Sequence, residues 1–222
     1  MTMRAGSLVS LAVACGVMLG SADAQASVVT GSFAGTITSG SDSTGVFGAV
    51  ATDLTGTSIS GTFSYDPNLF SSVLAGTTNT ATGTSLGALT VTLTIGSGSH
   101  RFTDQTSSSI YLDTGASEFT IQNADSQSSG ASSANETFYL DALDPFTPFV
   151  TSQNLDQSFN ASPAFSTGTF SILDSAPDLT ASGAFTLTSL TLTGTAIPEP
   201  AGLALLGSGL VGLVAFRRRT RG

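Results

Sequence analysis

The sequence predicts an all-β fold, an antiparallel β-sandwich of the jelly-roll type, for the body of this 222-residue chain. Three observations predict it. Apolar residues alternate with small hydroxylated ones at a period of two, which is the pattern of half-buried strands. Gly, Asp, Asn, Pro and Ser divide these stretches, as turn residues do. No stretch of the body, residues 27–196, shows a helical period, and strands without intervening helices favour a sandwich.

The alternating pattern predicts eight strands, near Val28–Thr38, Ser58–Tyr65, Leu89–Ile95, Ser109–Leu112, Glu118–Gln122, Glu136–Leu143, Thr167–Leu173 and Ala184–Thr193. Turn chemistry predicts the breaks between them, at Ser39–Asp42, Asp66-Pro67-Asn68, Gly96–Ser99, Asp113-Thr114-Gly115, Asp144-Pro145 and Ala176-Pro177-Asp178. Two polar, low-complexity stretches, Gly76–Gly87 and Asn123–Asn135, are interpreted as loops.

A Gly-x-Phe element recurs in strand-like stretches, at Gly31-Ser32-Phe33, Gly61-Thr62-Phe63, Gly168-Thr169-Phe170 and Gly183-Ala184-Phe185. We expect each Phe to point inward and to supply the large apolar area that the missing tryptophan does not. The irregular separations between the four copies argue against a solenoid or propeller with a fixed repeat.

Residues 1–26 have the three parts of a secretory signal peptide. Arg4 supplies the positive start, an apolar run extends from Leu8 to Leu19, and small residues follow at which signal peptidase can cut, after Ala24 or Ala26. An ordinary buried N-terminal helix is the alternative, although the glycines in and after the run would weaken it.

The only cysteine, Cys15, lies inside this signal. A lipoprotein signal would use it, but the small residues before it and the apolar run that continues past it fit that reading badly. Cleavage after Ala24 or Ala26 removes Cys15, so the exported body would hold no thiol, disulfide or thiolate metal site. Its stability must then come from packing, and a chain of this size buries roughly 70% of its unfolded surface without covalent cross-links.

The C-terminal end, residues 197–222, has three dissimilar parts in order. Pro198, Glu199 and Pro200 cannot sit inside a helix or sheet, so we expect an extended, accessible segment there. The sixteen apolar residues that follow, Ala201 to Phe216, form a single transmembrane helix in this reading. That helix would span about 24 Å at ~1.5 Å per residue, and snorkelling arginines would close the gap to the ~30 Å hydrocarbon core. The membrane stop on the cytoplasmic side would then be Arg217, Arg218, Arg219 and Arg221.

This order of parts resembles the PEP-CTERM sorting tail of exported bacterial proteins. The resemblance rests on Pro198, Glu199, Pro200, the glycine-rich apolar run and the terminal arginines. It implies transient anchoring in the inner membrane, recognition by an exosortase, a membrane peptidase that processes the tail, and release or attachment at the cell surface. Such proteins commonly occur in bacteria that make extracellular polysaccharide and biofilm. A permanent single-span anchor is the alternative.

The charge pattern argues against nucleic acid as a partner. Every one of the six basic residues is an arginine, and five of them lie in the terminal segments, so Arg101 is the only basic residue of the body. Phosphate binding rests on clustered Lys and Arg, which the acidic body lacks.

Two residues invite a catalytic reading of the body. Asp113-Thr114-Gly115 resembles the core of aspartic peptidases, but that chemistry needs two carboxylates sharing a proton, and the chain has no second such motif. We interpret it as a turn. His100 is the only histidine, so a multi-histidine metal site is excluded, and we do not interpret it as part of a Ser-His-Asp triad. We place His100 at the surface or at a strand edge and expect a non-catalytic body without cofactor.

Calcium and sugar are the two ligands left open. Calcium requires hard oxygen ligands, and eight aspartates lie in or beside predicted loops, although none forms an Asp-x-Asp-x-Asp-Gly array: Asp42, Asp104, Asp113, Asp125, Asp141, Asp144, Asp174 and Asp178. A solvated acidic rim is the preferred interpretation. Threonine runs at Thr90–Thr94 and Thr186–Thr195 place hydroxyl rows on strand faces. Such rows keep extracellular polysaccharide binding open, and with less support ice binding, while a simple wet sheet face explains them equally.

Overall fold

The computed structural model describes residues 28–103, 106–129, 132–174 and 179–194; the expected signal peptide and sorting tail lie outside these ranges. Thirteen described strands form one antiparallel sheet, and η1 (Pro67–Leu69) is a single 3-10 turn. The strands are β1 (Val29–Asp42), β2 (Thr52–Asp53), β3 (Ser58–Tyr65), β4 (Phe70–Ala75), β5 (Thr78–Gly83), β6 (Leu89–Ile95), β7 (Gly98–Thr103), β8 (Ser107–Asp113), β9 (Glu118–Ser129), β10 (Ser132–Leu143), β11 (Phe159–Ala161), β12 (Phe165–Asp174) and β13 (Leu179–Thr193).

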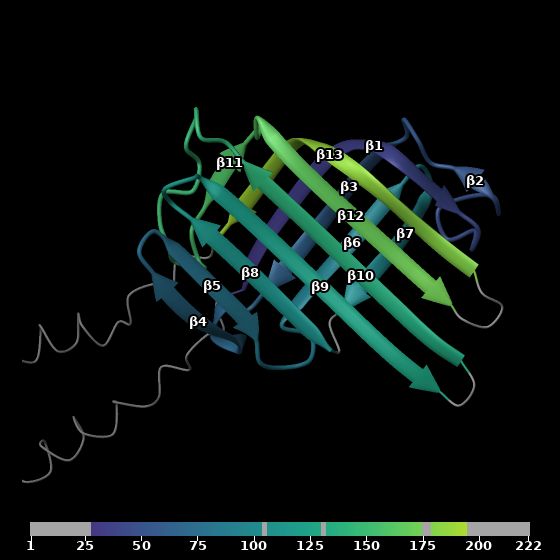
Figure 1. Ribbon diagram of the computed structural model, residues 1–222, viewed down its shortest axis with the longest axis horizontal. Helices are drawn as coiled ribbons and strands as arrows, with labels where there is room; N and C mark the ends of the chain where they lie inside the picture. The colour runs from purple at the N-terminus through teal and green to yellow at the C-terminus, as the bar shows by residue number, and fades with distance from the viewer. Residues whose placement is uncertain (1–27, 104–105, 130–131, 175–178, 195–222) are drawn as a thin grey trace, which may run out of the picture. The chain divides into compact units, whose positions relative to one another are not determined.

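The sheet curls over on itself so that its two halves become two layers. The strand order is β4-β5-β8-β9-β10-β12-β13-β1-β3-β6-β7, with β11 on β13 and β2 on β1. Strands β4 to β12 of this order form the front layer in Figure 1, and they cross the back layer of β1, β3, β6 and β7 steeply. Steeply crossed layers are one of the two ways in which sheets pack face to face.

The all-β, antiparallel prediction is confirmed, but the two separate sheets of a jelly roll are replaced by one continuous sheet. The reason lies in β1 and β13, which are long enough to pass around the bend. Register shifts interrupt their pairing between Ala34 and Gly35 and between Ile37 and Ser39. Such bulges bend a strand sharply, so the two layers share strands instead of being linked by loops.

The core fills the space between the layers, and Phe138 of β10 lies near its centre. Its ring contacts three rings from the opposite half of the sheet, those of Phe33, Phe102 and Phe185, at centroid distances of 5.7, 5.7 and 6.1 Å. Strict alternation supplies these side chains: along β6, every second residue from Leu89 to Ile95 is buried. Stacked and tilted rings at such distances stabilise a core beyond the area that they bury.

The Gly-x-Phe elements that begin at Gly31, Gly61, Gly168 and Gly183 form two reciprocal pairs, and their four Phe side chains are buried as predicted. In β1 and β3, Gly31 lies opposite Phe63, and Phe33 lies opposite Gly61. The same reciprocal pairing joins β12 and β13, where Gly168 lies opposite Phe185 and Phe170 opposite Gly183. Each ring therefore covers the glycine of the partner element, a relationship that the sequence spacing did not indicate.

The eight predicted strands correspond to β1, β3, β6, β8, β9, β10, β12 and β13, but three segments were interpreted wrongly. Gly76–Gly87 contains β5, Asn123–Asn135 lies largely within the β9–β10 hairpin, and Ser39–Asp42 continues β1. The short strands β2, β4, β7 and β11 were also not predicted. Most of these segments consist of small or polar residues, so backbone pairing builds them without the apolar alternation that marks a strand. The predicted turn at 176–178 lies outside the described residues.

Candidate functional site

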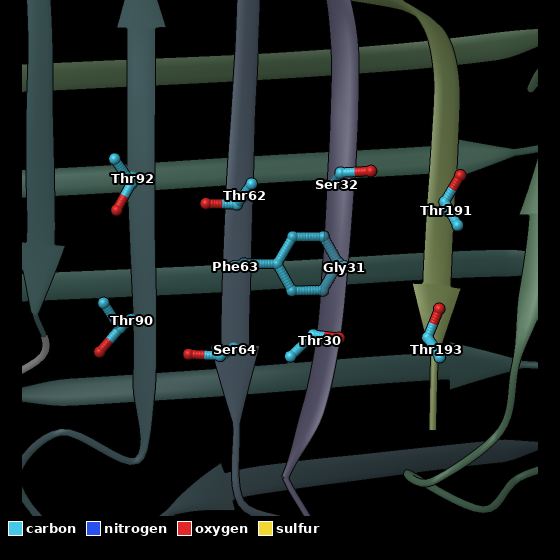
Figure 2. Close-up of a pocket in the computed structure, with 10 residues that line it drawn as sticks. All are labelled: Thr30, Gly31, Ser32, Thr62, Phe63, Ser64, Thr90, Thr92, Thr191 and Thr193. Carbon is cyan, nitrogen blue, oxygen red and sulfur yellow. The ribbon is translucent and has the colours of Figure 1, made fainter. Parts of the chain in front are cut away.

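The outward side of the back layer presents two rows of hydroxyl side chains. Thr191, Ser32, Thr62 and Thr92 form one row across β13, β1, β3 and β6, because each is in register with the next. Thr193, Thr30, Ser64 and Thr90 form the second row in the same way. Figure 2 shows the two rows side by side, and we call these eight residues the hydroxyl face.

A hollow of about 390 Å³ lies between the two rows. Its lining consists of the hydroxyl face together with Gly31 and Phe63, which stand between the rows on β1 and β3. Neighbouring strands lie about 4.8 Å apart and alternate residues along a strand about 6.7 Å apart, so the hydroxyls form a regular grid. The lining carries no charged side chain; the nearest in register is Arg101, opposite Thr92.

The hydroxyl face can exchange hydrogen bonds in both directions. Every Ser or Thr hydroxyl offers one donor and two acceptor sites, which suits a ligand that itself carries many hydroxyl groups. The threonine runs predicted from sequence contribute Thr90, Thr92, Thr191 and Thr193. In the structure, four further residues of β1 and β3 join these threonines, and the sequence analysis missed them: Thr30, Ser32, Thr62 and Ser64. The alternation around Val29 and Phe63 could have indicated them, because it places their hydroxyls outward.

Asp113 ends β8 and forms the turn that its sequence predicted. Its carboxylate accepts a hydrogen bond from the backbone N–H of Gly115 at 2.7 Å. A hydrogen bond from the Thr77 side chain, aided by the backbone N–H groups of Gly115 and Ala116, holds the pKa of Asp113 below its usual value of 3.8 despite slight desolvation. An ionised turn residue of this kind differs from a carboxyl group that shares a proton.

A second polar group lies on the outward side of the front layer, on β8, β9 and β10. The Thr120 hydroxyl, a single donor, lies 3.4 Å from Glu118 Oε1 and 3.2 Å from Asp141 Oδ1. Desolvation, then the charges of Asp141 and Asp113, raises the pKa of Glu118, and desolvation raises the pKa of Asp141. The neighbouring Tyr111 has a raised pKa for the same two reasons, burial and nearby carboxylates.

His100 lies on β7, an edge strand as predicted, and its half-buried side chain lies on the same strand face as that of Phe102. Its Nε2 is 3.2 Å from Glu136 Oε1 on β10, so the pair links the back layer to the front layer. The His100 ring also packs edge-on against Phe102 at 4.8 Å. This pairing is the structural role that the geometry gives His100.

The aspartates considered for calcium are mostly held by the protein itself. Asp42 is fully buried and accepts hydrogen bonds from Thr44 N, Thr44 Oγ1, Gly45 N and Phe47 N at 2.6–2.9 Å. Burial opposes these bonds, but together they lower the pKa of Asp42. Asp144 accepts from the N–H groups of Phe146 and Thr147. Within the described ranges, no three His, Cys, Asp or Glu side chains are grouped to hold a metal; Asp104 and Asp178 lie outside them.

The terminal signals fall outside the described residues: the cleavage positions Ala24 and Ala26, the motif Pro198-Glu199-Pro200, and the arginines Arg217, Arg218, Arg219 and Arg221. Among the residues that are described, no helix is long and apolar enough to cross a membrane.

Comparison with known families identifies the C-terminal segment. The model of the PEP-CTERM protein-sorting motif matches residues 196–219. The chain therefore carries the sorting signal of an exported protein whose processing partner is an exosortase, as the sequence predicted. No curated protein and no solved structure matches the chain.

Proposed function

We propose that this exosortase substrate is a non-catalytic protein of the cell surface or extracellular matrix. In this proposal, the signal peptide starts export, the apolar helix of the tail holds the chain briefly in the inner membrane, and processing then delivers the body to the surface or the medium. The observation that carries the proposal is the sorting motif at residues 196–219. The described carboxylates support a non-catalytic body, because Asp42, Asp113 and Asp144 serve as loop and turn acceptors.

The test is fractionation of cells that have an active exosortase. Replacing Pro198, Glu199 and Pro200 by Ala should leave unprocessed chain in the inner membrane. The matched control is Pro145→Ala with Pro148→Ala, which removes two exposed prolines from the body. If the motif variant is processed and located like the unaltered chain, the sorting role is wrong. If processed native chain keeps its apolar end stably in the bilayer, the transient anchor is wrong.

A second candidate activity is binding of extracellular polysaccharide by the hydroxyl face. The observation that favours it is the hollow, whose lining is uncharged and rich in groups that both donate and accept hydrogen bonds. An acidic body would repel an anionic polymer, since only Arg101 is basic in the body. A neutral, hydroxyl-rich glycan is therefore the best matched ligand.

Retention of the full chain on immobilised neutral polysaccharide from the host tests this activity. Thr30→Val, Thr62→Val and Thr92→Val together remove three hydroxyls of the hydroxyl face and keep β-branched side chains that suit a strand. Thr80→Val, Thr167→Val and Thr169→Val change three exposed threonines of the front layer and serve as the control. Loss of retention in the first variant alone is expected. Equal retention of both variants, or none by the unaltered chain, argues against the activity.

A further inference from the structure

The last strand of the body is held on both edges up to the point where the sorting tail begins. On one edge, Thr193 of β13 lies opposite Thr30 of β1. On the other edge, β11 pairs with β13 from Leu190 to Leu192. One residue later, the N–H of Gly194 donates to Ser158 Oγ at 2.9 Å, and this hydroxyl lies 3.5 Å from the Gly194 carbonyl oxygen.

Gly194 lies so close to the neighbouring backbone that no side chain could replace its hydrogen. A Cβ built on Gly194 would lie 1.7 Å from the carbonyl oxygen of Asp156. Asp156 and Ser158 belong to the segment Phe149–Ala161, which we call the strap. We call the contacts of Gly194 with Asp156 and Ser158 the clamp.

The strap is itself firmly attached to the body, so the clamp has a rigid support. The Tyr65 hydroxyl donates to the Leu155 carbonyl at 2.6 Å, and Asn79 Nδ2 donates to the Gln153 carbonyl at 2.7 Å. The Phe159 ring packs edge-on against Phe149 at 5.0 Å and against Phe119 at 5.4 Å. Anchors from three parts of the chain therefore keep the strap in place.

The clamp leaves little chain between the folded body and the processing motif. Pro198 follows Gly194 by four residues, and four Cα–Cα steps span at most about 14 Å. A peptidase binds its substrate as an extended segment, which includes several residues on each side of the cleavage point. Gly194 itself falls within the few residues that precede Pro198, so the enzyme cannot take up this stretch of chain in full while Gly194 stays clamped.

We infer that the clamp of Ser158 and Asp156 on Gly194 limits processing by the exosortase, which acts on chains whose β13 end has opened. The inference rests on exosortase processing of the tail. Opening detaches Gly194 from the strap and then Thr193 from β1, which lengthens the free segment ahead of Pro198. When opening and closing are fast, cleavage follows the population of the open form. Ser158 is a positioning residue in this scheme.

A pulse-chase experiment in a host with active exosortase measures this control. Ser158→Ala removes one hydrogen bond, which should increase the open population and the processing rate roughly three- to tenfold. Gly194→Ala should act in the same direction through its clash with Asp156, and Ser158→Thr should keep the slow rate. Ser152→Ala is the matched control, because Ser152 lies in the strap and its Oγ accepts from Asn154 N within the strap.

A spacer inserted after Gly194 distinguishes an effect on access to Pro198 from an effect on the stability of the body. Ten flexible Gly and Ser residues inserted after Gly194 should speed processing and make the unaltered chain and Ser158→Ala equal. Melting temperatures of the purified full chains and hydrogen exchange of the Gly194 amide show whether the body is folded and the clamp open. The inference is wrong if Ser158→Ala and the unaltered chain are processed at equal rates while the Gly194 amide exchanges faster in the variant. That result leaves the proposed function untouched. Absence of processing in every chain overturns the exosortase premise and the inference with it.

Discussion

The Phe63 ring occupies the space that a side chain at Gly31 would need. A Cβ built on Gly31 would lie 2.1 Å from Phe63 Cζ, and the two residues are opposite each other in β1 and β3. Phe63 is itself buried and stacks on Tyr65 and Phe119, so its ring has no free space to enter. The glycine of each Gly-x-Phe element is thus as specific as its Phe.

Gly31→Ala should therefore lower the free energy of unfolding by about 1–3 kcal/mol, the usual cost of overpacking a core. Urea denaturation of the purified chain measures it. Gly48→Ala is the control, because a Cβ there meets nothing within 4 Å. If the two variants are equally stable, the ring does not constrain the glycine.

Asp42→Asn should destabilise the body at neutral pH by about 2–3 kcal/mol, because hydrogen bonds to a charged acceptor are strong and the buried N–H of Phe47 loses its carboxylate partner. The folded-state pKa of Asp42 is lowered, so its carboxylate stabilises the fold above the unfolded pKa, and this contribution is lost as pH falls through the folded pKa. Urea denaturation at pH 7 and at acid pH should show the difference between variant and unaltered chain shrinking with acid. If the difference in unfolding free energy does not change with pH, the Asp42 carboxylate does not stabilise the fold through its charge.

Glu118→Gln should have the opposite effect and raise stability at pH 7. The folded-state pKa of Glu118 is raised by burial and by Asp141, so the fold is favoured below the unfolded pKa, and that advantage disappears as pH rises through the folded pKa. Glutamine keeps an oxygen for the Thr120 hydroxyl. Unfolding curves between pH 3 and pH 7 should show a gain that is absent in acid. If Glu118→Gln destabilises the body at pH 7, burial and the charge of Asp141 do not disfavour the ionised Glu118.

Tyr65→Phe should loosen the strap. Its hydroxyl is the buried donor to the Leu155 carbonyl, and burial, followed by the charge of Asp156, raises the pKa of Tyr65. Leaving that carbonyl without a donor should cost about 1–3 kcal/mol. Hydrogen exchange should show faster opening of the strap, including β11 at its end. Tyr111→Phe on the outward side of the front layer is the control, and equal exchange in both variants contradicts the role of Tyr65.

Much of the fold was accessible from the sequence because burial leaves a period-two pattern. The strands at the centre of the sheet, such as β6 with its alternation from Leu89 to Ile95, were predicted with nearly their observed bounds. Strands without apolar alternation were not: β5 consists of Thr, Asn, Ala and Gly, and β4 exposes the adjacent Val73 and Leu74. Backbone hydrogen bonds require no particular side chain. The outer part of the β9–β10 hairpin, where Ser132 pairs with Ser129 and Ser133 with Ser128, was missed for the same reason.

The amino-acid sequence was enough to identify an exported protein, because a sorting motif is a linear segment, and the match at residues 196–219 requires no knowledge of the fold. It also determined the fold class, through alternation. The tertiary structure alone decided what lies side by side: Phe63 over Gly31, Thr92 in line with Thr191, and Ser158 against Gly194. Those relationships depend on strand order and register, which arise from long-range pairing around the bend in β1 and β13 and are not encoded in any short stretch of residues.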